Sequence, residues 1–407
     1  MRLIYTICLL SICLCQILLS LDLGVDAFFE DGHLSYLKDQ RIGLITNQTG
    51  VNKNLQSTIS LFKNQRVCRL VALFAPEHGI DGLERAGQKV DHKKQASDLP
   101  VYSLYGKTRR PTKDMLDKVD VLIYDIQDIG VRSYTYATTL FYVMEEAAKH
   151  NIKVIVLDRP NPINGLVVDG PMLDSDWRSF IGYINVPYCH GMTIGELSLF
   201  FNKEYKIGCD LKVVKMKGWE RQMSFKDTKL RWIPTSPHIP EGDTPLFYAA
   251  TGLLGELNVA NIGVGYTIPF KLIGAPWINS AEFCKQLNAQ KLPGVVFVPF
   301  AYRPFYGSYK DQDCQGTLIC PTNPRLFKPV LTQYAILGLL KSLYPKQFDQ
   351  RLRESSSVAK KLFCQAHGSD HILKILENQK YVTWALREID KEKRQNFLQL
   401  REKYLLY

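Results

Sequence analysis

A glutamate and a histidine follow directly after a predicted buried strand in the first hundred residues. The run Leu70–Ala75 is apolar, and the chain then turns at Pro76 and presents Glu77 and His78. In an open parallel sheet, ligands bind at the carboxyl ends of the strands. A buried strand must end in a polar turn in any case, so this pair by itself leaves both a site and a plain surface turn open.

Three further apolar runs end in polar clusters of the same kind: RIGLITNQTG at 41–50, VDVLIYDIQDIG at 119–130 and IKVIVLDRPNP at 152–162. Parallel strands that end at one edge of a sheet would bring these clusters together. We therefore expect one site there, which combines Glu77 with a set of polar side chains. They are Asn47, Asp125, Asp128, Arg132, Asp158 and Arg159.

The junction after the third run is the densest in polar and aromatic groups, and it includes Tyr134 and Tyr136. Asp128 could simply cap the following helix with Arg132 as its partner. The number of such groups exceeds what capping requires, which favours a ligand surface.

Two histidines complete the candidate set. His190 precedes a predicted helix over 192–205, in which Thr193 and Glu196 have the spacing of a capping box. His238 lies in the Pro-rich stretch 232–245, which is typical of a domain boundary or a cleft wall. Either histidine could also be an ordinary loop residue.

The alternation of strands and helices predicts an α/β fold, with a Rossmann-like parallel sheet domain over 28–235 and a smaller α+β auxiliary domain over 236–407. Further strands are expected at 211–219, on an edge, and at 295–300, and helices at 26–40, 54–63, 331–343 and 388–404. The aromatic segment 302–309 (YRPFYGSY) suits either stacking on a sugar ring or core packing.

The N-terminus has the layout of a signal peptide, with Arg2 before an uncharged apolar run from Leu3 to Leu21. We expect residues 1–27 to be the signal peptide and the protein to be exported, to the periplasm or the outside of a bacterium. An uncleaved anchor, and hence membrane association, is the alternative. Among the cysteines beyond this segment, Cys314 and Cys320 are the expected disulfide, and Cys68 and Cys209 are expected to be buried.

Composition and motifs exclude several functions. The net charge of +11 is spread along the 407 residues, without the pattern of a nucleic-acid module. No GxGxxG or Walker A motif follows a strand, so no nucleotide cofactor is expected. Carboxylates, amides, arginines and aromatics suit glycoside hydrolysis, which uses two carboxyl groups. A divalent metal held by Asp125 and Asp158 is the other chemistry that they allow.

Several motifs resemble those of the bacterial exo-β-N-acetylmuramidase family, glycoside hydrolases of the NamZ type. These motifs are GLITNQTG, LFAPEHGIDG, YDIQDIGVRSYTY, DRPNPINGLVVDGP, PYCHGMTIGELSLFFN, SPHIP and PFKLIGAPW. The resemblance implies a Rossmann-like catalytic domain and release of N-acetylmuramic acid from the non-reducing end of peptidoglycan fragments. It also implies that Glu77, in the PEHG motif, is the catalytic acid.

Two features depart from the family pattern. His238 stands where relatives have an amide, and the segment Asn261–Gly265 has neither the acid nor the arginine of their Glu-Gly-Arg-Gly-Thr loop. We expect Glu77 to act as general acid/base, with Asp125 or Asp128 as its partner. The remaining candidates are expected to bind a muropeptide or disaccharide. A non-catalytic muropeptide-binding protein and a metal-dependent hydrolase are the alternatives.

Overall fold

The computed structural model describes residues 21–85, 87–89 and 99–407. Its first unit is a six-stranded sheet in the order β3-β2-β1-β4-β5-β6, and every neighbouring pair is parallel. The strand order reverses between β1 and β4, and such a reversal opens a crevice at the carboxyl edge of the sheet. The strands are β1 (Arg41–Thr46), β2 (Arg69–Ala75), β3 (Val101–Ser103), β4 (Val121–Asp125), β5 (Lys153–Leu157) and β6 (Leu211–Val214).

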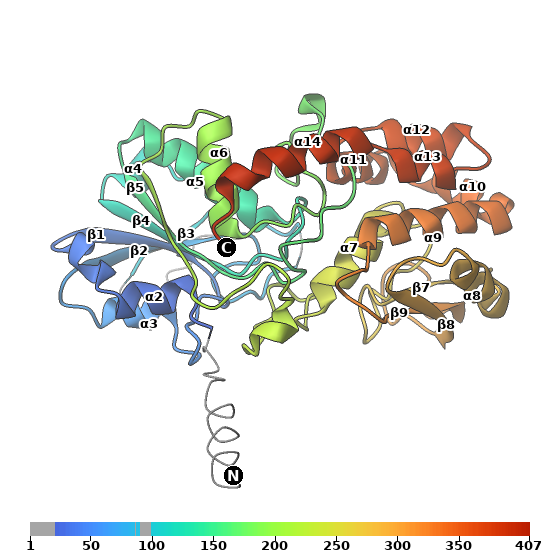
Figure 1. Cartoon of the computed structure of the whole chain (residues 1–407), viewed down its shortest axis with the longest axis horizontal. Helices are drawn as coiled ribbons and strands as arrows, with labels where there is room; N and C mark the ends of the chain where they lie inside the picture. Colours follow the sequence, from blue (N-terminus) through green and yellow to red (C-terminus); the bar gives the residue numbers. More distant parts are fainter. Residues whose placement is uncertain (1–20, 86, 90–98) are drawn as a thin grey trace, which may run out of the picture.

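Both faces of this sheet are covered, because its strands are apolar on both sides. Phe74 and Tyr124 pack into a core with α5 and α6 on one face, whereas Leu44 and Ile123 pack into a second core with α2 and α3 on the other (Figure 1). The helices are α2 (Gly24–Glu30), α3 (Thr58–Lys63), α4 (Lys113–Leu116), α5 (Thr135–Lys149) and α6 (Ile194–Glu204), with 3₁₀ turns η1 (His33–Leu37), η2 (Ser175–Trp177) and η3 (Phe225–Thr228). The predicted Rossmann-like sheet is confirmed.

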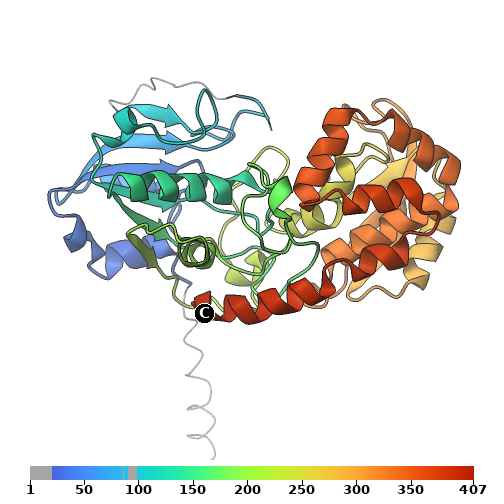
Figure 2. The same cartoon turned by 90° about the horizontal axis from the view of Figure 1, so that it is seen from above.

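The second unit is built on a three-stranded antiparallel sheet in the order β7-β9-β8 and a group of helices (Figure 2). Its strands are β7 (Leu272–Ala275), β8 (Val295–Tyr302) and β9 (Cys314–Pro321). Its helices are α7 (Thr244–Gly255), α8 (Ser280–Ala289), α9 (Pro329–Leu343), α10 (Pro345–Glu354), α11 (Ser357–His367), α12 (His371–Asn378), α13 (Thr383–Glu388) and α14 (Lys391–Arg401), followed by η4 (Glu402–Tyr404). This agrees with the predicted α/β sheet followed by a smaller α+β unit.

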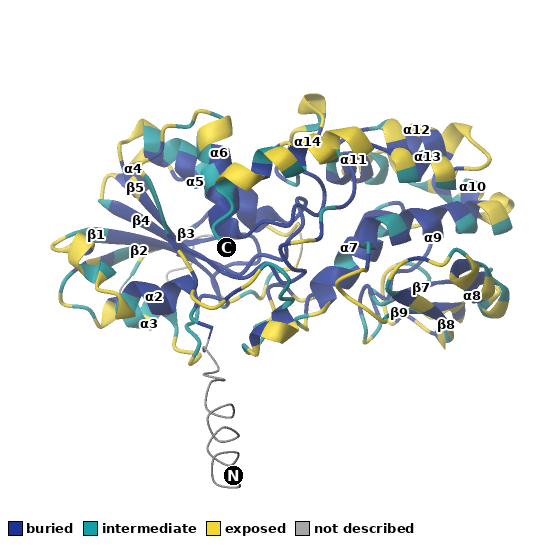
Figure 3. Ribbon diagram, in the orientation of Figure 1, coloured by how far each residue is buried: buried dark blue, intermediate teal, exposed yellow. Residues whose placement is uncertain are grey.

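Helix α14 returns the chain from the second unit to the first, as the red helix of Figures 1 and 2 shows. The rings of Phe397 and Tyr404 meet Phe200 of α6 with centroids 6.0 and 5.4 Å apart, and Tyr407 meets Trp219 at 5.1 Å. Buried residues run without interruption through the centre of both units (Figure 3).

The N-terminal part of the described chain is integral to the first unit. Val25 and Ala27 are buried in α2, and a Cβ at Gly24 would lie 2.2 Å from the backbone nitrogen of Asp158. Cleavage after Ala27 would therefore remove core contacts, and the end of the signal peptide stays a prediction. No helix among the described residues is long and apolar enough to cross a membrane, and the predicted membrane association stays a prediction. Most of the apolar N-terminal run itself, residues 3–20, lies outside the described residues.

The predicted disulfide is wrong. Cys314 and Cys320 lie at opposite ends of the same strand, β9, and both are free, as are the other described cysteines. Six steps along a strand separate them by roughly 20 Å, whereas a disulfide requires Cα atoms within about 7 Å. Cys68 and Cys209 are buried, as predicted.

Candidate active site

The Glu77 carboxylate is the best-positioned acid at the carboxyl edge of the parallel sheet. It follows β2 and is only 7% exposed. Its Oε1 accepts a hydrogen bond from the Gly87 amide at 2.8 Å, and its Oε2 accepts one from Thr135 Oγ1 at 2.7 Å. Thr135 is the first residue of α5, so the positive end of that helix dipole faces the carboxylate. These contacts fix the carboxyl group in one orientation.

Tyrosines surround this carboxylate. Burial, together with the charge of Glu77, raises the pKa of Tyr105 to about 12. Burial is also the main cause that raises the pKa of Tyr248 to about 12 and that of Tyr136 well above its ordinary value, and the Glu77 charge contributes to both. The ring of Tyr134 lies edge-on to Tyr136 with centroids 4.8 Å apart. The hydroxyl groups therefore stay protonated and can donate hydrogen bonds near Glu77.

The segment 234–238 forms the wall of the site on the side of the second unit. Tyr136 Oη donates to the Thr235 carbonyl at 2.6 Å, and Tyr134 Oη donates to Thr235 Oγ1 at 2.9 Å. Gln48, which follows β1, donates from Nε2 to the Pro234 carbonyl at 2.8 Å. The predicted cleft wall in the Pro-rich stretch therefore contacts the site directly.

Two of the three predicted histidines, His78 and His238, lie on this side. His78 has a positive φ of 70°, which is uncommon for a residue with a side chain, and its Nδ1 lies 2.7 Å from the Glu84 carbonyl oxygen. Burial, and next the charge of His78, lowers the pKa of His238. His238 Nε2 is hydrogen-bonded to Tyr306 Oη at 2.9 Å, which connects the wall to the second unit.

Asp128 is a second candidate carboxyl group at this edge of the sheet. Its Oδ2 accepts from the Gly130 amide at 2.8 Å, whereas its Oδ1 is buried and has no hydrogen-bond partner among the described residues. Burial raises the pKa of Asp128 to about 7, against the opposing effect of backbone hydrogen bonds from Gly130 and Ile129. The charge of Asp128 in turn contributes to the raised pKa of Tyr134, whose ring contacts Tyr136. Asp128 can therefore hold or release a proton near neutral pH.

Asn47 also presents an unpaired polar atom at this edge. Its Oδ1 accepts from the Thr49 amide at 2.9 Å and from Thr49 Oγ1 at 2.6 Å, while its Nδ2 is buried and finds no acceptor in the part of the chain that the structure describes. A buried unpaired donor costs free energy unless a ligand satisfies it. Asn47 follows β1 and Asp128 follows β4, so both lie at the strand-order reversal.

Asp125 and Arg159, in contrast, satisfy each other. Arg159 Nε donates to Asp125 Oδ1 at 2.6 Å, with side-chain exposures of 4% and 0%. Thr58 Oγ1 donates to Asp125 Oδ2 at 2.5 Å, and Arg159 Nη2 donates to the Val51 carbonyl at 2.7 Å. Arg159 also lines a small pocket together with Lys53. The pair ties β4 and β5 to the loop after β1.

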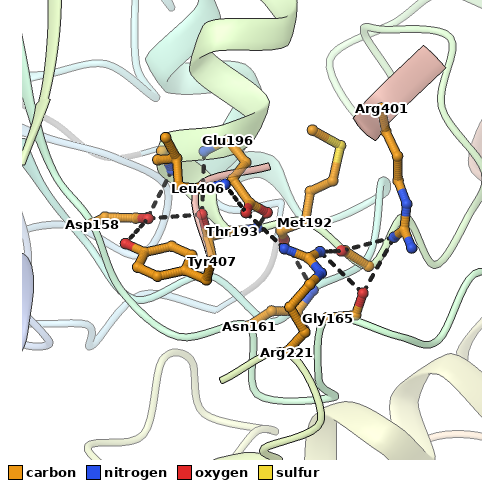
Figure 4. A network of polar contacts seen from close by, with 12 residues as sticks. Asp158, Asn161, Gly165, Met192, Thr193, Glu196, Arg221, Arg401, Leu406 and Tyr407 are labelled. Atoms are coloured by element: carbon orange, nitrogen blue, oxygen red, sulfur yellow. Dashed lines mark hydrogen bonds and ion pairs between the residues drawn. The ribbon is translucent and has the colours of Figure 1, made fainter. Parts of the chain in front are cut away.

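Asp158 is enclosed in the network drawn in Figure 4. It accepts hydrogen bonds from Thr193 Oγ1 at 2.8 Å, from Tyr407 Oη at 2.7 Å and from the Gly195 amide at 2.8 Å. Burial raises its pKa to about 7. Since β1 and β4 lie between β2 and β5, Asp158 is roughly 14 Å across the sheet from Glu77.

Arg132 and His190 also have internal partners. Arg132 donates to four backbone carbonyls, those of Pro171, Val186, Ala366 and His367, at 2.6 to 3.1 Å. His190 Nδ1 accepts from the Met192 amide at 3.1 Å, and burial, with Arg401 next, lowers its pKa to about 3. The predicted substrate-binding roles of both stay predictions, although these contacts give each a structural role.

Sequence reasoning missed four residues of the candidate site: Gln48, Tyr105, Thr135 and Tyr248. Gln48 and Thr135 each stand within three residues of a predicted site residue, so their position along the sequence was a usable signal. Tyr105 follows β3, a short strand that the sequence pattern did not predict. Among the described residues, no group of three or more His, Cys, Asp or Glu side chains could hold a metal ion.

Comparison with known proteins gives a consistent result over nearly the whole chain. The family model described as the N-terminal part of exo-β-N-acetylmuramidase NamZ matches residues 42–243, and the model of its C-terminal part matches residues 246–407. The peptidoglycan β-N-acetylmuramidase NamZ of Bacillus subtilis strain 168 is 41% identical over 385 residues, which are 94% of this chain and 91% of that protein.

Two crystal structures of DUF1343 family proteins from Bacteroides fragilis NCTC 9343 are also similar. The one determined at 1.65 Å is 39% identical with a TM-score of 0.89, and covers 95% of this chain and 99% of that chain. The other, determined at 1.30 Å, is 25% identical with a TM-score of 0.71 and the same coverage.

Proposed function

This chain belongs to the NamZ exo-β-N-acetylmuramidase family of glycoside hydrolases, and we propose that it releases N-acetylmuramic acid from the non-reducing end of peptidoglycan fragments. The observation that carries the proposal is the Glu77 carboxylate, held by Thr135 and Gly87 at the carboxyl edge of the sheet and surrounded by tyrosines. Hydrolysis of a glycoside requires one carboxyl group that gives a proton to the leaving oxygen.

Glu77 is the general acid/base in this proposal. It is buried, it is fixed by two hydrogen bonds, and the protonated hydroxyl of Tyr105 lies close to it. In the first step its proton passes to the glycosidic oxygen as the bond to the anomeric carbon breaks. Water then forms a bond to the anomeric carbon, and the proton that it loses passes to the Glu77 carboxylate, which restores the acid.

Asp128 is the better of the two candidate partners. Both oxygens of Asp125 accept hydrogen bonds, from Arg159 and Thr58, whereas Asp128 Oδ1 accepts none from residues 21–85, 87–89 and 99–407. An unpaired carboxyl oxygen can bind the attacking water or face the positive charge that develops on the sugar ring. The neighbouring Asn47 Nδ2, also unpaired, can hydrogen-bond a substrate oxygen or acetamido carbonyl.

The first test is release of chromophore from para-nitrophenyl N-acetyl-β-muramide by the full chain, beside the matching N-acetylglucosaminide. We expect turnover of the muramide, and in Glu77→Gln a loss of about a hundredfold to ten-thousandfold in kcat. The matched control is Glu145→Gln, which changes a carboxylate ten residues further along α5 from Thr135 and should retain activity.

Three outcomes separate the candidate functions. Retained turnover in Glu77→Gln would refute the role of Glu77. Tight binding of a muropeptide without turnover by the folded wild type would favour the non-catalytic alternative. Loss of activity in a chelator, restored by a divalent cation, would favour a metal-dependent hydrolase.

The apolar run from Leu3 to Leu21 supports the further proposal that the protein is exported and acts in cell-wall turnover or recycling. Fractionation of the bacterial cell with an antibody to the protein tests this. Recovery of all the protein in the cytoplasm would contradict it.

A further inference from the structure

The loop that joins β8 to β9 exposes two aromatic rings. Phe305 is 62% exposed and Tyr306 is 50% exposed, whereas Tyr302 of the same aromatic segment is buried. From the sequence, the segment could serve either sugar stacking or core packing. In the structure Tyr302 packs in the core, whereas Phe305 and Tyr306 are accessible. Exposed neighbouring aromatic rings commonly mark a binding surface.

The loop is held in place by the second unit. The Phe305 amide donates to the Gly265 carbonyl at 2.6 Å, and Asn261 Nδ2 donates to the Ser308 carbonyl at 2.9 Å. Gly265 has a φ of 91°, and a Cβ there would lie 2.0 Å from the Tyr306 carbonyl oxygen, so only glycine fits. The rings are therefore positioned before any ligand arrives, which lowers the entropy cost of binding.

Tyr306 lies next to the wall of the Glu77 site. Its hydroxyl is hydrogen-bonded to His238 at 2.9 Å, and the two rings are stacked with centroids 6.2 Å apart. His238 is three residues beyond Thr235, which both Tyr134 and Tyr136 contact. The exposed rings thus continue the surface of the site on the side of the second unit.

A sugar is the ligand that this surface fits. A pyranose ring has an apolar face of C–H groups that packs on an aromatic ring, and equatorial hydroxyls that hydrogen-bond to groups such as the His238 imidazole. An exo-acting enzyme closes around the terminal sugar that it releases and must leave the rest of the substrate room on the other side of the scissile bond. Glu77 is buried whereas Phe305 and Tyr306 are exposed, so these rings are accessible to the part of the substrate that extends beyond the terminal sugar.

We propose that Phe305, Tyr306 and His238 form a platform that binds the sugar on the leaving-group side of the scissile bond. This inference rests on the proposed function and adds to it the residues that select the second sugar. The platform involves His238 and the Asn261–Gly265 segment, the two places where the resemblance leads us to expect a departure from the family's pattern.

The test compares a β-1,4-linked N-acetylmuramic acid–N-acetylglucosamine disaccharide with the methyl β-glycoside of N-acetylmuramic acid, which lacks the second sugar. In Phe305→Ala/Tyr306→Ala we expect the ratio of kcat/KM for the disaccharide to kcat/KM for the methyl glycoside to fall about tenfold, the size of one to two aromatic contacts. Gly265→Ala, which displaces the Tyr306 backbone, should lower the same ratio. Trp384→Ala removes a ring that is 75% exposed on α13 and serves as the control.

Each result decides the matter. A wild type that hydrolyses both substrates, with an unchanged ratio in the double variant, would overturn the platform and leave the proposed function intact. An equal fall on both substrates would also overturn it, since the rings would then act on the fold or on the first sugar. A folded wild type that hydrolyses neither substrate would overturn the proposed function together with the platform.

Discussion

Replacement of Asp128 by asparagine should change how the stability of this protein depends on pH. In the folded state burial raises the pKa of Asp128 from 3.8 to about 7, and no group of the described residues donates to its Oδ1. Asparagine can keep an acceptor for the Gly130 amide but cannot ionise. The variant therefore removes the cost of holding a buried negative charge.

The sign and size follow from linkage. Below pH 3.8 the carboxyl group is protonated in both states and costs nothing. As the pH rises, the unfolded chain ionises first, so the wild type loses stability, until above pH 7 both states are ionised and the full cost is reached. With the quoted pKa values the cost is about 2 kcal/mol at pH 5 and about 4 kcal/mol at pH 8.

Urea unfolding of the two proteins at pH 5 and pH 8, followed by tryptophan fluorescence, measures this difference. The variant should gain roughly 2–3 kcal/mol relative to the wild type between the two pH values. Any pH-independent effect of the new amide cancels in that comparison. The control is Asp120→Asn: Arg41 lowers the pKa of Asp120, which is therefore ionised in both states from pH 5 to 8, and its variant should show a constant difference. An equally constant difference for Asp128→Asn would refute the raised pKa.

Two further predictions concern the residues that hold the site together. Arg159→Met removes the charge partner of the buried Asp125 carboxylate and leaves it the Thr58 hydroxyl, so the free energy of unfolding in urea should fall by about 3–5 kcal/mol. The added Asp125→Asn change should restore part of it. A loss below about 1 kcal/mol would contradict the structural role of the pair. Thr135→Val removes a hydrogen bond to the Glu77 carboxylate and should lower kcat about tenfold with little change in KM. Thr135→Ser keeps that bond and should retain activity, and equal kcat values for the two variants would exclude a positioning role for the hydroxyl.

The sequence by itself determined the parallel sheet and the place of its site. Apolar runs ending in polar clusters identified β1, β2, β4 and β5, because strands buried on both faces must be apolar throughout. The predicted capping box of α6 is confirmed. The Thr193 side chain accepts a hydrogen bond from the Glu196 amide, and the Thr193 amide donates one to the Glu196 carboxylate. These signals are local, since they depend on residues close together in the chain.

The tertiary structure decided which polar side chains at that edge are free. Asp125 and Asp128 stand three residues apart in one loop, yet Arg159 from β5 satisfies the first and nothing among the described residues satisfies Oδ1 of the second. Arg132 donates hydrogen bonds to the carbonyls of Ala366 and His367, which are more than 200 residues away in sequence. A residue's type shows what it can bind, but its partners come from distant segments that only the fold brings together.

The second unit was the part that the sequence predicted least well, again because its pairings join distant segments. Its strand β8 was predicted, but β7 and β9 pair in an antiparallel sheet whose partners are 40 or more residues apart. The expected Cys314–Cys320 bridge failed because both residues lie along one extended strand. The sequence thus determines the helices and strands and the edge of the sheet at which a candidate site forms. Which polar groups of that site are structural partners and which are free to bind a ligand is decided by the packed molecule. The reason is that burial and pairing with distant residues set the energy of each charge.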